Sequence, residues 1–182
     1  SMLMTPQLDL LVEGFHAIQS LITSLFERHH LRASFAAKPY ADQPGSGLHV
    51  HVHLENEEGD NVFTKDDVQM SDPLKWVLAG LIETMSLYRP IFLPKKHSFA
   101  RLDGADPHAP SHICWGANNR TAALRLPIKP AHNKHIEHRV SGADANITQV
   151  LQAIMAGMLH GLRDCPALMP QLYGNAFDPQ YQ

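Results

Sequence analysis

The sequence predicts an α+β fold: a largely antiparallel sheet with helices packed on one face. Two kinds of apolar periodicity lead to this prediction. Three segments place apolar residues three or four positions apart, as amphipathic helices do, and others alternate apolar and polar residues, as strands do. The chain has 182 residues, of which 44% are hydrophobic, so it is long enough for a single domain with its own core but short of two.

The first predicted helix covers residues 6–28. Pro6 is tolerated in the first turn of a helix, and the pattern ends near His29. The apolar stripe consists of Leu8, Leu11, Val12, Phe15, Ile18, Ile22, Leu25 and Phe26. Residues 38–47 have the Pro and Gly content of an ordered loop.

A strand is predicted at residues 48–54, where apolar residues and histidines alternate strictly. One face carries Leu48, Val50, Val52 and Leu54, and the other carries His49, His51 and His53. An acidic turn follows, and the second helix is predicted at residues 72–88 with Asp72, rather than Ser71, as its N-cap. Residues 89–110 are rich in Pro, Gly and His, and a loop of this length in a compact domain is usually functional.

Two further strands are predicted, one at residues 113–126 and one at residues 136–140. In the second of these, Glu137 and Arg139 share one face, and the apolar positions share the other. The third helix is predicted at residues 146–163, because the spacing of Asn146 and Gln149 resembles a capping box. The tail beyond Pro166 has the composition of turns, and the chain as a whole shows no dividing linker.

Composition excludes several classes of function. The formal net charge of −3 and the pI near 6.5 provide no basic field for nucleic acid, and no segment approaches the roughly 20 apolar residues that cross a membrane. Cys114 and Cys165 have no CxxC spacing, which favours a reducing, cytoplasmic compartment. The sequence also lacks the GxSxG, HExxH and GxxxxGK[ST] motifs.

The 13 histidines are the unusual feature of the composition. His49, His51 and His53 lie on one predicted strand face about 7 Å apart, so neighbouring imidazoles can share an ion. The alternative is a row of solvent-facing histidines at the edge of a sheet. The preceding Gly45-Ser46-Gly47 favours a site, because glycines allow the backbone to approach a ligand closely, although such a sequence is often only a turn.

A second candidate group is cationic and consists of Arg101, Arg120, Arg125 and Arg139. Guanidinium groups suit carboxylates and phosphates, although each arginine alone could be a surface residue or pair with an acid. Glu137 shares a face with Arg139 and has two interpretations: a salt-bridge partner, or a hard oxygen ligand for Mg²⁺ or Mn²⁺.

Five motifs in order resemble the C-terminal catalytic domain of the glutamine synthetase family, which includes the γ-glutamyl polyamine synthetases. They are Gly45–His51 (GSGLHVH), His97–Leu102 (HSFARL), Trp115–Pro127 (WGANNRTAALRLP), Ile136–Arg139 (IEHR) and Asp144–Asn146 (DAN). The resemblance covers roughly residues 30 to 180. It implies the family's catalytic fold in part, and an ATP-dependent ligase that joins ammonia or a small amine to the γ-carboxylate of glutamate through γ-glutamyl phosphate.

By position, the resemblance implies roles for single residues. His49 and Glu137 are expected to bind the Mg²⁺ or Mn²⁺ ion that contacts ATP. Arg101, Arg139 and the backbone of Gly45 are expected to hold glutamate, and Arg120 is expected to stabilise the phosphoryl group in catalysis. The residues expected to contact ATP are His51, His53, Arg125 and His135.

The sequence departs from the family at four places. Pro44 replaces an asparagine, His53 replaces a serine, and His135 replaces an arginine. The segment that carries the ammonium-binding glutamate in the family reads GADPHAP here, so Asp106 or His108 is the candidate substitute. This change is compatible with an organic amine in place of ammonium.

The resemblance also implies missing parts. Family members have an N-terminal β-grasp domain, further metal-binding glutamates and active sites shared between subunits of a ring. We therefore expect this chain alone to be a single, partial domain without catalytic activity. Two alternatives remain open: a noncatalytic family member that binds nucleotide or metal or serves in assembly and, less favoured, a small HxH metal enzyme such as an oxygenase.

Overall fold

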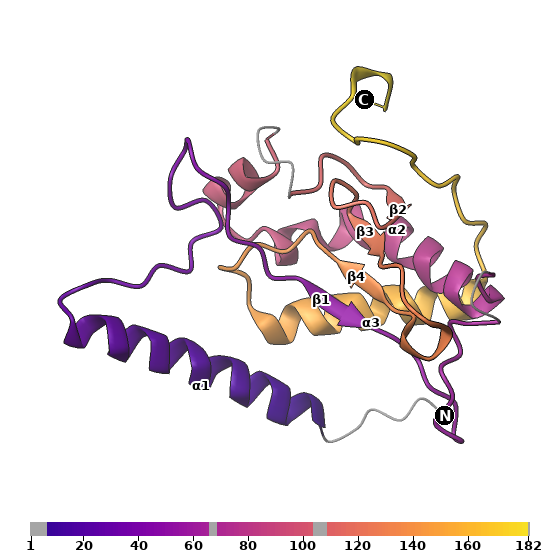
Figure 1. The fold of residues 1–182 in the computed structure, drawn as a ribbon, viewed down its shortest axis with the longest axis horizontal. Helices are drawn as coiled ribbons and strands as arrows, with labels where there is room; N and C mark the ends of the chain where they lie inside the picture. Colours follow the sequence, from indigo (N-terminus) through magenta and orange to yellow (C-terminus); the bar gives the residue numbers. More distant parts are fainter. Residues whose placement is uncertain (1–6, 66–68, 104–108, 182) are drawn as a thin grey trace. The chain divides into compact units, whose positions relative to one another are not determined.

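The computed structural model describes residues 7–65, 69–103 and 109–181 (Figure 1). The chain divides between Phe35 and Ala36 into two compact units. The first contains α1 (Gln7–Arg28), which confirms the predicted helix over these residues, while Pro6 lies outside the described residues. The second contains all other helices and strands and is described below by itself. No described helix is both long enough and apolar enough to span a membrane.

The second unit is built on a four-stranded sheet of order β1-β4-β3-β2. Its strands are β1 (Val50–Val52), β2 (Trp115–Ala117), β3 (Leu124–Leu126) and β4 (Ile136–His138). β4 pairs antiparallel with both β1 and β3, whereas β2 and β3 are parallel. The predicted antiparallel character is therefore confirmed for two of the three pairings.

The single strand predicted at residues 113–126 is wrong. The structure divides this segment into β2 and β3, joined by turn and bend residues 118–123. Asn118 begins the turn with a left-handed φ of 50°, a conformation that asparagine tolerates better than most residues. The apparent alternation of apolar and polar residues therefore ran across a turn.

α2 (Asp72–Phe92) and α3 (Ile147–Asp164) extend along the sheet (Figure 1). The predicted cap of α2 is wrong, because Ser71 is the N-cap and its side chain accepts a hydrogen bond from the backbone N–H of Leu74. α2 also continues four residues beyond the predicted end, through Pro90, and a 3-10 helix (Lys96–Arg101) occupies part of the predicted loop. The predicted cap of α3 is confirmed, since Asn146 accepts from Gln149 N.

The apolar face of the sheet packs with α2 and α3 in one core, which includes Leu78, Leu124, Ile136 and Ile154. His138 also lies in this core, with its ring 4.6 Å from that of Phe92. Burial lowers the pKa of His138 to about 3, so the imidazole is neutral at physiological pH. Because side chains alternate along a strand, Glu137 lies on the opposite face of β4.

Three glycines allow α2 and α3 to pack closely. A Cβ at Gly161 of α3 would collide with the backbone carbonyl of Trp76 on α2. A Cβ at Gly80 would collide with the backbones of Gly157 and Gly161. Backbone atoms cannot swing aside as a flexible side chain does, so this crossing requires glycine at these positions.

We predict that Gly161→Ala lowers the free energy of unfolding by about 1–3 kcal/mol, because an added methyl group forces the two helices apart. Thermal or urea unfolding followed by circular dichroism measures this effect. Gly14→Ala is the matched control, since a Cβ at Gly14 has no neighbour within 4 Å and alanine favours a helix. Equal stability of Gly161→Ala and the original chain would contradict the close crossing.

Candidate functional site

The candidate site centres on the Glu137 carboxylate of β4, whose side chain is only 4% exposed. Arg139 Nη1 donates to Glu137 Oε1 at 2.6 Å, and Arg125 Nη1 donates to Oε2 at 2.7 Å. Arg139 lies two residues further along the chain and Arg125 lies directly opposite on β3, so both reach the same face of the sheet. The sheet register thus places one carboxylate between two guanidinium groups.

His49, just before β1, completes this cluster. Its Nδ1 lies 3.1 Å from Glu137 Oε1, and its Nε2 lies 3.4 Å from Arg101 Nη2. An arginine only donates hydrogen bonds and a carboxylate only accepts them. These two contacts fit a neutral imidazole with its proton on Nδ1. Arg139 Nη1, 3.4 Å from the same nitrogen, then donates to Glu137 Oε1 and not to His49.

The electrostatics of the cluster keep Glu137 ionised. Burial by itself raises the pKa of the Glu137 carboxyl, but hydrogen bonds from His49 and Arg125 and the charge of Arg139 outweigh it and hold the pKa well below its ordinary value. His51 pairs opposite Glu137 in the register, with Nε2 4.0 Å from Oε1. Burial and the neighbouring positive groups lower the pKa of His51 by more than the negative charge of Glu137 raises it. The lowered pKa favours a neutral ring.

Arg101 approaches the cluster from the end of the 3-10 helix and is 3% exposed. Its guanidinium donates to the backbone carbonyls of Val140 at 2.9 Å and Arg139 at 3.1 Å. A Cβ at Gly45 would lie 2.7 Å from Arg101 Cγ, and one at Gly47 would collide with the guanidinium. The glycine loop is therefore needed for the close approach of Arg101. The predicted approach of this loop to a ligand stays a prediction.

Three of the predicted residues lie outside the central cluster. His53 Nε2 lies 2.8 Å from a carboxylate oxygen of Glu55, in an exposed pair. The ring of His135 lies 5.0 Å from that of His51, and its Nδ1 is 2.7 Å from the backbone carbonyl of Asn133. Arg120 is exposed and borders a cavity of about 430 Å³ between residues 117–120 and 171–174. Asp106 and His108 lie outside the described residues.

Three residues contribute to the geometry in ways that the sequence analysis does not anticipate. Asn118 Oδ1 accepts from Arg125 Nη2 at 2.6 Å and so fixes the second half of that guanidinium. Ser98, one turn of the 3-10 helix before Arg101, donates to Asp144 Oδ2 at 2.7 Å. Asn118 and Asp144 both lie in motifs named above, but only the folded structure shows that Asn118 holds Arg125 and that Asp144 accepts from Ser98 of the 3-10 helix that ends at Arg101.

The donor chemistry of His49 and Glu137 fits a divalent cation that accepts nitrogen and hard oxygen ligands. The pair forms only part of a coordination shell. Within residues 7–65, 69–103 and 109–181, no group of three or more His, Cys, Asp or Glu residues is arranged to hold a metal ion. The half-site expected from the sequence stays a prediction.

Comparison with known proteins gives a consistent result. The family model described as glutamine synthetase, catalytic domain, matches residues 13–182. The γ-glutamylputrescine synthetase PuuA of Escherichia coli (strain K12) is 38% identical over 164 residues, which are 90% of this chain and 34% of that protein. The glutamate–isopropylamine ligase of a Pseudomonas species is 30% identical over 162 residues, covering 88% of this chain and 35% of that protein.

A solved structure with the same fold is that of GmaS in complex with ADP. It superimposes with a TM-score of 0.81 at 28% identity, over 93% of this chain and 40% of that chain. The chain therefore spans about a third of the length of the curated relatives it matches.

We predict that Glu137→Gln lowers the free energy of unfolding by about 3 kcal/mol at neutral pH, because two largely buried guanidinium groups lose their counter-charge. Urea unfolding followed by circular dichroism measures this loss. Glu55→Gln is the matched control, since Glu55 pairs with His53 at the surface, where such a pair contributes at most about 1 kcal/mol. Similar unfolding midpoints for the two variants would show that Glu137 does not stabilise the fold.

Proposed function

The chain belongs to the glutamine synthetase family, and on this premise we propose that it is part of an ATP-dependent ligase. The proposed reaction joins ammonia or a small amine to the γ-carboxylate of glutamate through γ-glutamyl phosphate. The names of two relatives, a γ-glutamylputrescine synthetase and a glutamate–isopropylamine ligase, support an amine-dependent reaction. Because the chain spans about a third of these relatives, the activity, its substrates and any ring assembly belong to the proposal.

The observation that carries the proposal is the Glu137 carboxylate held between Arg125 and Arg139 on the sheet face opposite the core. Two cations beside one anion leave a net positive charge that suits a phosphate or a carboxylate. The buried Nε–H of Arg125 has no hydrogen-bond partner within the described residues. An oxygen of an anionic ligand is the kind of acceptor that this donor lacks.

In this proposal, Glu137 and His49 hold the Mg²⁺ or Mn²⁺ ion. Bound ATP supplies the phosphoryl group, and the divalent cation neutralises its charge. Arg125 and Arg120 would contact the phosphate oxygens, and the neutral ring of His51 would offer a lone pair or an N–H to the nucleotide. His53 and His135 would contact the nucleotide only after giving up their contacts with Glu55 and Asn133.

Arg101 and Arg139, with the backbone of Gly45, form the proposed glutamate pocket. The two backbone carbonyls that accept from Arg101 fix its guanidinium before a ligand arrives, which limits the entropy that binding costs. Asp106 or His108 is the proposed base that takes a proton from the attacking amine. Cys114 and Cys165 are both free thiols, which agrees with the cytoplasm as the proposed compartment.

A noncatalytic binder of nucleotide and metal is the second candidate. The observation that favours it is the incomplete donor set, since the described residues include no group of three or more His, Cys, Asp or Glu side chains arranged to hold a metal ion. This candidate predicts binding without turnover. Both candidates predict no turnover by this chain alone, so assays of ATP hydrolysis with glutamate and an amine distinguish them only on a protein that also supplies the further metal-binding glutamates.

We predict that calorimetric titration with Mn²⁺ shows one binding site that requires a nonhydrolysable ATP analogue. Glu137→Gln and His49→Gln should both abolish this site, because each removes one of the two proposed ligands. The His49 variant makes the test independent of the stability loss expected for Glu137→Gln. His29→Gln, which removes an exposed histidine from the other unit, is the control for adventitious binding to imidazole.

The titration has clear contrary outcomes. Mn²⁺ binding that persists in both ligand variants would place the ion elsewhere and overturn the proposed site. The absence of any nucleotide-dependent binding by the folded chain would overturn the proposed ATP-side function of this domain.

A further inference from the structure

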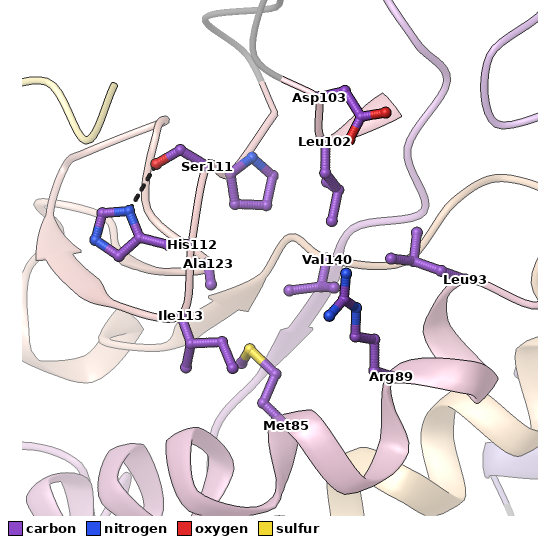
Figure 2. A pocket seen from close by; sticks show the side chains of 11 residues that line it. Met85, Arg89, Leu93, Leu102, Asp103, Ser111, His112, Ile113, Ala123 and Val140 are labelled. Atoms are coloured by element: carbon purple, nitrogen blue, oxygen red, sulfur yellow. Dashed lines mark hydrogen bonds between the residues drawn. The ribbon is translucent and has the colours of Figure 1, made fainter. Parts of the chain in front are cut away.

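A cavity of about 440 Å³ lies beside α2, apart from the Glu137 cluster. Figure 2 shows its walls, which come from the C-terminal half of α2, residues 102–103, residues 110–113, and single residues before β3 and after β4. Val140 lines the cavity and also belongs to the core, whereas the residue before it, Arg139, pairs with Glu137 in the candidate site and does not line the cavity. The cavity is therefore a separate feature.

The described residues that line the cavity are mainly apolar. Met85, Leu93, Leu102, Ile113 and Val140 all contribute side chains to it. Pockets for small ligands typically measure about 300–1,000 Å³ and combine an apolar wall with a few polar groups that fix orientation. The volume and lining of this cavity fall within that description.

Arg89 of α2 provides the charged group. Its side chain extends among the labelled lining residues in Figure 2, and its guanidinium lies 4.8 Å from the centre of the Phe99 ring. Within the described ranges no carboxylate forms an ion pair with Arg89, although Asp103 lines the same cavity. A guanidinium stacked on an aromatic ring is held in place while its N–H groups stay available to an acceptor.

We propose that this cavity binds a small organic acid, namely a monocarboxylate with a compact apolar body. The carboxylate pairs with Arg89, and the apolar body lies against Met85, Ile113 and Val140. Asp103 on the same cavity repels a second negative charge, which favours a monocarboxylate over a dicarboxylate or a phosphate. This proposal does not depend on the ligase function.

The cavity also borders the chain segments that hold the arginines of the candidate site. Leu102 follows Arg101 directly, and Val140 follows Arg139. The carbonyl of Val140 accepts from Arg101, and the carbonyl of Ala123, another lining residue, accepts from the backbone N–H of Arg139. A ligand in the cavity therefore contacts both segments from the side opposite the site.

The test is a titration with benzoate, followed by NMR on the chain labelled with ¹³C at the methionine methyl groups. Met85 lines the cavity, and its signal is assigned with Met85→Leu. We expect a saturable shift of the Met85 methyl signal. Arg89→Gln should weaken binding about tenfold, because a hydrogen bond to a charged group contributes about 1.5–3 kcal/mol.

Two sets of controls separate this site from weak apolar binding. Arg163→Gln removes an equally positive residue from the surface of α3 and should leave the benzoate affinity unchanged. Benzamide and benzylamine have similar shapes without the negative charge and should bind at least about tenfold more weakly to the unaltered chain. This comparison needs no variant, so it stands even where Arg89→Gln fails to fold.

Three outcomes would overturn the proposal. The first is that the Met85 signal shows no saturable shift. The second is that benzoate and benzamide bind with equal affinity. The third is that Arg89→Gln folds and binds benzoate as tightly as the unaltered chain. Since none of these measurements involves nucleotide or metal, failure here leaves the proposed ligase function untouched, and failure of the Mn²⁺ titration leaves this cavity untouched.

Discussion

The arrangement of the second unit depends on the pairing of one buried carboxylate with two guanidinium groups. Glu137 is almost inaccessible to solvent, and its charge is retained because His49, Arg125 and Arg139 all interact with its two oxygens. This pairing also fixes the register of the sheet, since Arg125, Glu137 and His51 lie opposite one another on β3, β4 and β1. A shift of one residue on β4 would turn Glu137 into the apolar core and place His138 outside, so the charges and the core select the same register.

The parts of the fold with a strong local period could be predicted from the sequence, because periodicity is a local property. The helix over Gln7–Arg28, the cap of α3 at Asn146 and the shared face of Glu137 and Arg139 follow from spacing alone. The N-cap of α2 could not be decided in this way, because serine and aspartate cap helices about equally well and Pro73 fits the first turn with either residue. The division between β2 and β3 could not be predicted either, since the residues of the intervening turn continue the alternation of apolar and polar residues.

The contacts that orient the arginines of the site could not be predicted from local spacing. Arg101 is held by the backbone carbonyls of Arg139 and Val140, which any sequence provides, and its helix is tied to the rest of the unit by Ser98 and Asp144. The three histidines of β1 and its flanks show how far alternation alone predicts contacts. His49 and His51 face Glu137 as their alternation suggests, but His53 pairs with Glu55, because an acid two residues away offers a nearer partner. Alternation assigns a side chain to a face, and the nearest complementary charge then decides its contact.

Two different environments lie within one residue of each other, at the end of β4 and at the end of the 3-10 helix Lys96–Arg101. Arg139 faces the charged site and Val140 lines the apolar cavity, and the same relation holds for Arg101 and Leu102. Because the backbone carbonyl of Val140 accepts from Arg101, a displacement of Val140 by even a few tenths of an ångström also moves the acceptor that holds this guanidinium. Hydrogen bonds weaken with distance and angle, and packed interiors transmit small shifts. The charged face and the packed face of the sheet therefore share the backbone of Val140, whose carbonyl accepts from Arg101 while its side chain lines the cavity.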